Sequence, residues 1–205
     1  QGSGTSMVSW AWKVNGGTTS SLSGNLASVA QVNQDAGFSI VTYTGSGGNG
    51  QSVLHGLGLV PEVIITKARN GTGDWYVYHK SIGTANFLKL NTADAQAGSS
   101  PYNAADPTST AFFVSNDLIY VGELGANFIS YVFSSIQGYS KFGSYIGNGS
   151  GTSDGTFDGT FVYTGFKPAW VLIKPSSYSA GDGWVLFDNK RGPINYNQNQ
   201  LNPAS

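Results

Sequence analysis

The stretch Pro61–Lys80 reads PEVIITKARNGTGDWYVYHK, and a second stretch of the same design, PAWVLIKPSSYSAGDGWVLFDNK, occupies Pro168–Lys190. Each copy begins with a proline and a short apolar run that leads to a lysine, then continues through a glycine-containing loop to a tryptophan and another apolar run. Corresponding residues are 107 positions apart for the proline and the lysine and 109 for the tryptophan, in the pairs Pro61/Pro168, Lys67/Lys174 and Trp75/Trp184. A self-similarity at this spacing indicates a duplicated β unit, which sets the organisation of the rest of the chain.

The composition is that of a folded protein with a weakly charged surface. Of the 205 residues, 40% are hydrophobic and 13% aromatic, which is enough for a packed core. Only 10% are charged, against about 25% in ordinary globular domains. Ser, Thr, Asn, Gln and Gly must therefore cover the surface, as in extracellular and virion proteins.

Several classes of function are excluded by what the sequence lacks. The net charge of −1 without any basic run is not the footprint of a nucleic-acid-binding protein. There is no cysteine, hence no disulfide framework and no thiolate metal site. No apolar run reaches the roughly 18 residues that span a bilayer. The chain opens Gln1–Thr5 without an initiator Met or a signal peptide, so we expect a processed piece, or part of something longer.

Alternating apolar and polar residues between turn signals predict an all-β fold of short strands. We expect tandem related units, sandwich-like or jelly-roll-like, with at most one short helix, near Thr92–Ala105, and a polar connector at Thr18–Gly24. The expected strands are Met7–Val14, Leu26–Val32, Phe38–Tyr43, Ser52–Leu57, Glu62–Lys67, Trp75–His79, Phe87–Asn91, Ala111–Ser115, Leu118–Gly122 and Asn127–Ser134.

A second internal match extends the repeat. Phe128–Phe133, FISYVF, corresponds position by position to Met7–Trp12, MVSWAW. After each copy a Gly–aromatic–Ser triplet opens the next unit, at Gly37–Ser39 and at Gly138–Ser140.

This pattern predicts three parts of the chain. Residues 1–36 hold the end of an upstream unit and a connector, residues 37–137 form a complete β repeat, and residues 138–205 form the front half of a second unit, which stops before its closing strands. Half a β unit leaves unpaired strand edges. We therefore expect either a continuation of the chain or a partner that supplies the missing pairing.

Isolated histidines and repeated lysines are the first candidate site residues. His55 and His79 have no carboxylate or cysteine at ligand spacing, which favours a structural or surface role over metal binding or catalysis. Lys67 and Lys174 each end an apolar run, which is typical of a solvated residue that limits edge aggregation. Binding of an anionic ligand by these lysines is the alternative.

Trp75 and Trp184 could stack on a sugar, because each follows a glycine-rich loop. Core packing is favoured, since each begins an alternating apolar strand. Asp154 and Asp158 lie in a loose Asp/Gly loop that lacks the ordered acidic ladder of a calcium site.

The chain has two glutamates, Glu62 and Glu123, too far apart in sequence to indicate a glycosidase pair. No nucleophile-elbow, zinc-protease or phosphate-binding motif is present. The sequence thus predicts no catalytic, cofactor-binding or metal-binding residues, and a protein that is not an enzyme.

A series of motifs then carries a family resemblance: WAWKVNGG (Trp10–Gly17), GFSIVTYTG (Gly37–Gly45), HGLGLVPEVIITK (His55–Lys67), WYVYH (Trp75–His79), GYSKFGSYIGNG (Gly138–Gly149) and FVYTGFKPAWVLIK (Phe161–Lys174). In this order they resemble a repeated β-domain of virion and tail-associated structural proteins from tailed bacteriophages, many of them marine. Such domains often follow concanavalin A-like lectin domains. The resemblance covers nearly all of residues 7–192.

The resemblance implies a virion structural protein, most simply a tail-fibre or receptor-binding adhesin. Its partners would be other virion proteins and further copies of itself, a trimer in a fibre. The loops Gly45–Gly50, Ala97–Asp106 and Gly147–Thr156 would then face a host-surface carbohydrate. A capsid decoration protein is the first alternative, and a glycan-degrading enzyme the second.

Overall fold

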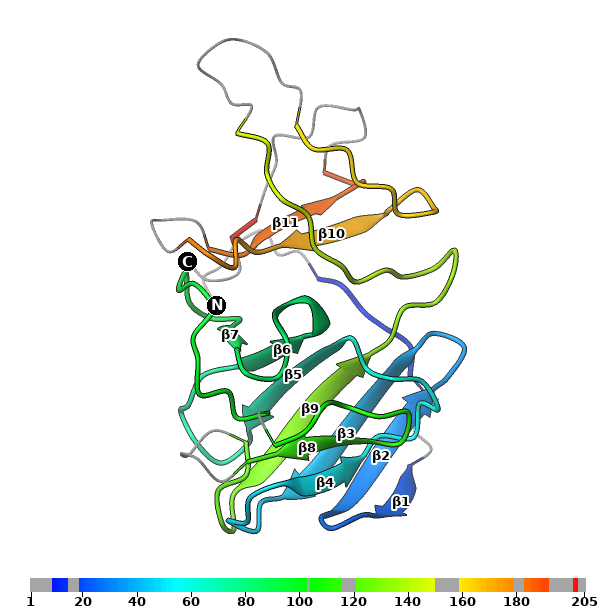
Figure 1. Ribbon diagram of the computed structural model, residues 1–205. Helices are drawn as coiled ribbons and strands as arrows, with labels where there is room; N and C mark the ends of the chain where they lie inside the picture. Colours follow the sequence, from blue (N-terminus) through cyan, green and yellow to red (C-terminus); the bar gives the residue numbers. More distant parts are fainter. Residues whose placement is uncertain are drawn as a thin grey trace, which may run out of the picture.

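The computed structural model describes residues 9–14, 19–102, 104–115, 121–149, 159–178, 183–191 and 201–202, and these form an all-β protein. Its strands are β1 (Ser20–Ser23), β2 (Ala27–Asn33), β3 (Phe38–Thr44), β4 (Gln51–Leu54), β5 (Val63–Ala68), β6 (Tyr76–His79), β7 (Leu88–Lys89), β8 (Ala111–Val114), β9 (Asn127–Phe133), β10 (Trp170–Ile173) and β11 (Val185–Asp188). An antiparallel sheet in the order β1-β2-β3-β9-β5-β6-β7 forms the centre of the molecule (Figure 1).

Both copies of the repeated stretch form antiparallel hairpins. In β5–β6, Val63 lies opposite His79, and in β10–β11, Trp170 lies opposite Asp188. Trp170 follows Val63 by 107 positions and Asp188 follows His79 by 109, which are the two offsets of the sequence repeat. The two hairpins therefore have the same register. The division of the chain into three parts stays a prediction, although β1 and β2 extend the sheet that residues 37–137 build.

The middle of the sheet is made by β9, which pairs with β3 on one side and β5 on the other. Phe38, at the start of β3, lies opposite Phe133, at the end of β9, and their rings stack with centroids 4.6 Å apart. The first and last strands of residues 37–137 are therefore direct neighbours.

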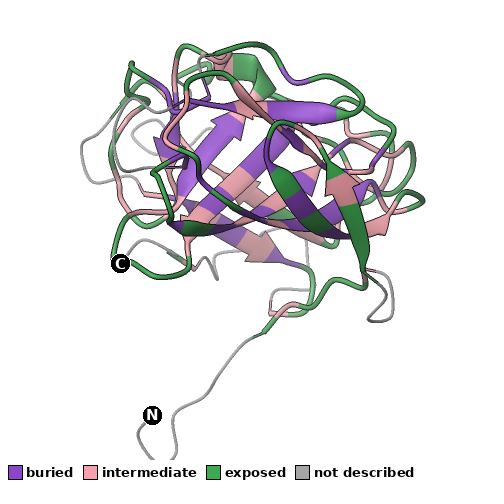
Figure 2. Cartoon of the chain, turned by 90° about the horizontal axis from the view of Figure 1, so that it is seen from below, coloured by how far each residue is buried: buried purple, intermediate pink, exposed green. Residues whose placement is uncertain are grey.

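One face of the sheet packs against the smaller β4–β8 sheet. Because side chains alternate along a strand, Val41, Ile64 and Phe128 all point to this face, where they meet Val53 and Phe112. These side chains are almost completely buried, and Figure 2 shows the buried positions concentrated in the strands. The two layers enclose the main hydrophobic core.

The buried polar groups of this core are hydrogen-bonded within it, except for the Ser39 hydroxyl, which has no partner. The Tyr43 hydroxyl donates to the carbonyl oxygen of Val121 at 2.7 Å. The hydroxyls of Thr66 and Ser130, on neighbouring strands, lie 2.7 Å apart. Such pairing avoids the free-energy cost of a buried polar atom without a partner.

The opposite face of the sheet carries the β10–β11 hairpin. Trp184 packs there against Val63, Val77 and Leu88. Its indole N–H donates to the carbonyl oxygen of Lys89 at 2.7 Å. This buried tryptophan therefore helps to join the second hairpin to the edge of the central sheet.

Three predicted elements differ from the structure. Thr18–Gly24 is not all connector, because Ser20–Ser23 forms the edge strand β1, whose pairing with β2 needs backbone groups rather than apolar side chains. Residues 9–14 are not in a strand, and of the strand predicted at Leu118–Gly122 the described residues, Val121 and Gly122, lie in a bend.

The described part of Thr92–Ala105 contains turns and bends but no helix. Its backbone is bonded to other segments instead: Phe87 and Ala97 exchange two hydrogen bonds of 2.9 and 3.0 Å, and the Gln96 N–H donates to Ser176 O at 2.8 Å. A short 3-10 turn forms elsewhere, at Lys80–Ile82.

Gly45→Ala is expected to destabilise the protein. Gly45 is buried against the chain at Gly122–Glu123, and a Cβ there would overlap the Glu123 carbonyl oxygen. Overpacking of this kind costs about 1–3 kcal/mol. Gly73→Ala is the matched control, because nothing lies within 4 Å of the added Cβ. Urea unfolding of both variants measures the difference; equal midpoints would contradict the close approach.

Trp184→Ala is expected to lower the free energy of unfolding by about 3–5 kcal/mol, because it opens a cavity between the hairpin and the sheet. Tyr178→Ala is the control, since Tyr178 is exposed on the same hairpin's loop. Denaturant unfolding followed by circular dichroism tests this. If the two variants were equally stable, the packing of Trp184 would not hold the second hairpin on the sheet.

Candidate functional site

The two histidines make backbone contacts inside the fold. His55 is fully buried; its Nε2 lies 3.2 Å from Thr108 O, and its Nδ1 accepts from the Leu57 N–H at 3.2 Å. This geometry fits a neutral imidazole, and burial lowers the pKa of His55. Among the described residues, no cluster of three or more His, Cys, Asp or Glu could hold a metal ion.

His79 stands at the start of the 3-10 turn. Its Nδ1 accepts from the Ser81 N–H at 3.1 Å. Burial, followed by the charge of Lys80, lowers its pKa. The ring therefore caps a backbone turn.

The repeated lysines bind backbone carbonyls. Lys67 donates to the carbonyl oxygens of Gly71 and Gly73, at 3.0 and 2.7 Å, and so holds the loop of its own hairpin. Lys174 donates to Ala93 O at 3.0 Å, which ties the second hairpin to the first unit. Both lysines stand at strand ends, as expected, and both are half-buried and bonded to loop carbonyls. Their role in limiting edge aggregation stays a prediction.

The two tryptophans have different environments. Trp184 is buried in the core, as its strand pattern predicts. Trp75 is half-buried and stacks on Tyr131, with centroids 6.2 Å apart. Asp154 and Asp158 lie outside the described residues.

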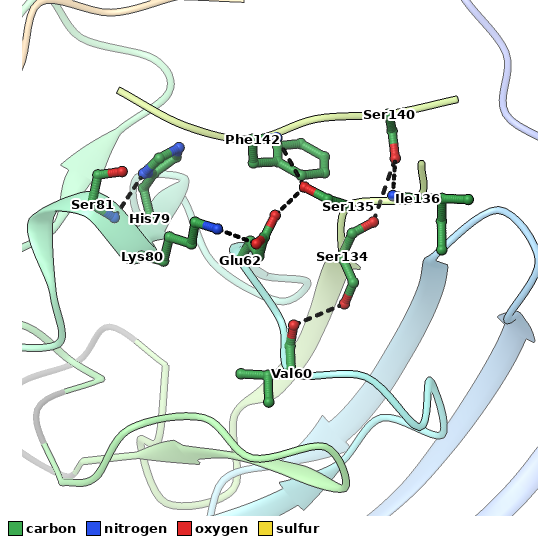
Figure 3. A network of polar contacts seen from close by, with 10 residues as sticks. All are labelled: Val60, Glu62, His79, Lys80, Ser81, Ser134, Ser135, Ile136, Ser140 and Phe142. Atoms are coloured by element: carbon green, nitrogen blue, oxygen red, sulfur yellow. Dashed lines mark hydrogen bonds and ion pairs between the residues drawn. The ribbon is translucent and has the colours of Figure 1, made fainter. Parts of the chain in front are cut away.

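The polar network around Glu62 ties three segments together (Figure 3). The Glu62 carboxylate accepts from the ammonium of Lys80, after β6, and from the hydroxyl of Ser135, after β9. Ser135 Oγ in turn accepts from the Phe142 N–H at 3.1 Å. The nearby Ser134 hydroxyl donates to Val60 O at 3.1 Å. The network holds the segment that leaves β9 toward the second unit.

Glu62 also lines an open depression of about 500 Å³. Its lining residues are Val60, Pro61, Glu62, Tyr78, Lys80, Gly83, Asp106 and Pro107. Burial, with the charges of Asp106 and Glu62, raises the pKa of Tyr78 and keeps its hydroxyl protonated. Two carboxylates and a phenol can exchange hydrogen bonds with a hydroxyl-rich ligand.

The same depression is poorly suited to acid catalysis. Burial acts to raise the pKa of Glu62, but the hydrogen bonds from Lys80 and Ser135 and the Lys80 charge lower it overall. A glycosidase acid needs the opposite shift. Glu123 lies beyond the other end of β9, which is about 20 Å long. The two glutamates are therefore not brought together.

Two of the three loops predicted to contact ligand are neighbours. Asn49, in Gly45–Gly50, accepts from the Ser115 hydroxyl at 2.6 Å, and the Ser115 N–H donates to Pro101 O, in Ala97–Asp106, at 2.9 Å. Gly147–Gly149 lies at the opposite end of the molecule, beside the second hairpin (Figure 1). The rest of Gly147–Thr156 is outside the described residues.

The most exposed apolar surface is an aromatic arm, formed by residues 141–149 and 159–164. The Thr160 hydroxyl donates to Ile146 O at 2.8 Å, and Lys141 Nζ donates to Tyr163 O at 2.9 Å, so the two segments lie side by side. Phe161 is 87% exposed and Tyr163 72%. The arm is not predicted from the sequence, because the continuous apolar run Phe161–Tyr163 resembles a buried strand and gives no sign of exposure.

Comparison with known proteins gives a family. A profile of the domain of unknown function DUF7483 matches residues 1–205. The chain belongs to the DUF7483 family. No curated protein and no solved structure gives a significant match. The description of DUF7483 names no activity, so the function of this DUF7483 chain is argued from its own residues. In its described part, no helix is long and apolar enough to cross a membrane.

Glu62→Gln is expected to reduce stability at neutral pH but not at acid pH. Since the folded-state pKa of Glu62 is depressed, the carboxylate stabilises the fold above its unfolded pKa of about 4.3, and this contribution is lost as the pH falls through the folded-state value. Urea midpoints of the wild type and the variant should therefore converge progressively as the pH falls below this unfolded-state value.

Glu123→Gln is the control for this experiment. It removes the same charge from an exposed turn outside the network. Its pH profile should parallel that of the wild type, whereas a constant gap between wild type and Glu62→Gln at every pH would contradict the role of the ionised carboxylate.

Proposed function

We propose that this protein is a structural component of a bacteriophage virion, a tail-fibre or receptor-binding adhesin that contacts host-surface glycan. The observation that carries the adhesin proposal is the aromatic arm, which holds Phe161 and Tyr163 in solvent on a β scaffold. The virion assignment rests on the motif resemblance. The all-β fold and the low charge of the chain support it.

The chemistry of the arm suits a carbohydrate. Aromatic rings offer flat apolar faces that pack on the C–H faces of sugars, while uncharged polar groups around them exchange hydrogen bonds with hydroxyls. Lys141 Nζ lies 5.8 Å from the centre of the Tyr163 ring and covers one of its faces. The ring is thereby held in place, and Phe161 remains the more accessible of the two.

A capsid decoration protein is the second candidate. Exposed apolar side chains are also typical of surfaces that other proteins cover, and Ile146, which is 89% exposed, has no polar group for a sugar. In this reading the arm packs on a neighbouring virion protein. A glycan-degrading enzyme is disfavoured by the lowered pKa of Glu62.

The deciding experiment locates the protein in the intact particle, by electron microscopy of purified virions at a resolution that traces the chain. Density on the tail or its fibres, in trimers, is the expected result. Density that tiles the head would replace the adhesin proposal by the decoration proposal. Absence from the particle would overturn both.

Phe161→Ala with Tyr163→Ala is expected to weaken glycan binding at least about tenfold, because buried aromatic anchors dominate binding energies. Binding of the wild type to a glycan array identifies the ligand, and titration then compares the variants. Tyr178→Ala, an exposed aromatic outside the arm, is the control and should bind normally. Equal affinities for all variants would remove the arm from the site.

A further inference from the structure

The second hairpin repeats more of the first unit than the two strands of the sequence match. In the first unit, Val77 of β6 pairs with Leu88 of β7. In the second, Leu186 of β11 forms an antiparallel bridge with Leu201, with backbone hydrogen bonds of 2.9 and 3.0 Å. Leu186 is the counterpart of Val77 at the repeat offset of 109, so the outer edges of the two hairpins are paired alike.

The two hairpins differ in the pairing of their inner edges, which are the edges of β5 and β10 that face away from β6 and β11. In the first unit, the inner edge of β5 pairs with β9 over its whole length. In the second unit, β10 pairs with β11, and among the described residues no strand pairs with its other edge. The position that β9 fills beside β5 is open beside β10. An open edge is a template for another strand.

The segment 9–14 carries the sequence of a β9 strand. In the alignment of MVSWAW with FISYVF, Trp12 is the counterpart of Phe133. At the offset of 107, Trp170 is the counterpart of Val63. Phe133 and Val63 are direct partners in the β9–β5 pairing.

Trp12 and Trp170 are in contact in the structure. Their rings meet edge to face, with centroids 5.6 Å apart and planes at 85°. Two residues that the repeat predicts as cross-strand partners are thus already side by side. Figure 1 shows the N-terminal segment, in dark blue, rising from the central sheet toward the β10–β11 hairpin.

A second observation points to a missing neighbour at the same position. The indole Nε1 of Trp170 is buried and has no hydrogen-bond partner. A buried donor without an acceptor costs free energy. A strand added beside β10 would bring backbone carbonyl oxygens, which can accept a hydrogen bond from the Trp170 indole N–H.

We propose that Ser9–Trp12 is the strand that completes the second unit of its own chain, by pairing antiparallel with the open edge of β10. The register follows from β9 and β5, with Ser9 opposite Ile173, Trp10 opposite Leu172, Ala11 opposite Val171 and Trp12 opposite Trp170. In this arrangement the segment 9–12 joins the central sheet, to which it is connected through β1, to the β10–β11 hairpin.

The contacts favour the same chain over a second copy. Trp12 touches Trp170 of its own chain. The next residue, Lys13, accepts a hydrogen bond of 3.1 Å at its carbonyl oxygen from the Asn33 side chain at the end of β2. The segment is therefore held against its own sheet, within reach of its own β10.

The absence of native cysteine makes the register directly testable. In an Ala11→Cys, Val171→Cys variant the two thiols would lie directly opposite each other, at a separation that a disulfide spans. Both positions are exposed, so the substitutions disturb no core packing. Under mild oxidation we expect a monomer without free thiols, seen by intact mass and on non-reducing gels.

The control variant, Ala11→Cys with Leu172→Cys, shifts one partner by one residue and turns it to the other face of the strand. It should form at least about tenfold less disulfide in the same time. Equal cross-linking of both variants, no cross-link in either, or disulfide-linked dimers in place of monomers would each overturn the proposal, the last by assigning the edge to a second copy.

Hydrogen exchange on the unmodified protein provides a measurement that does not depend on the folding of a variant. The two alternate amides of residues 9–12 that face β10 should exchange at least about tenfold more slowly than those of the neighbouring Lys13–Val14, because antiparallel pairing along one edge hydrogen-bonds every second N–H group. Unprotected amides throughout residues 9–14 would overturn the pairing.

Discussion

The pairing of β9 with both β3 and β5 is the constraint on which the rest of the structure depends. It joins strands that are far apart in sequence into one sheet, and it places Phe128 and Val132 in the core beneath the β4–β8 layer. Because β9 is the last strand of its unit, neither neighbour has its full set of backbone partners until it is in place. Contacts of such long range make folding slow and cooperative. The Glu62 network then fixes the point where the chain leaves β9.

The sequence predicts the parts of this fold that apolar alternation encodes. β9 and most of β3 are recognisable because buried side chains recur at every second position. The two hairpins are recognisable from their repeated apolar runs. β1 is not, since its residues, Ser20–Ser23, enter the sheet through backbone hydrogen bonds that polar side chains do not reveal. The Thr92–Ala105 segment has helix-forming residues, but its bonds to Phe87 and Ser176 hold it in turns.

The aromatic arm and the depression beside Glu62 were less predictable from the sequence, because both depend on which side chains the folded chain leaves exposed. Phe161 and Tyr163 lie in a continuous apolar run like that of a buried strand, and only the three-dimensional arrangement shows that both side chains are exposed. The depression beside Glu62 likewise combines residues from separate segments, with Tyr78 from β6 and Asp106 from a loop. Exposure of apolar groups and convergence of polar ones are both tertiary properties.

The stacked pair Phe38 and Phe133 has a consequence for how such chains change in length. These residues mark the two ends of the segment from β3 to β9 and lie side by side. The chain therefore enters and leaves this segment at neighbouring points. Units whose ends are adjacent tolerate insertion and removal with little strain on the rest of a protein. Duplication of such a unit would therefore lengthen the chain without disturbing the pairing of the strands on either side of it.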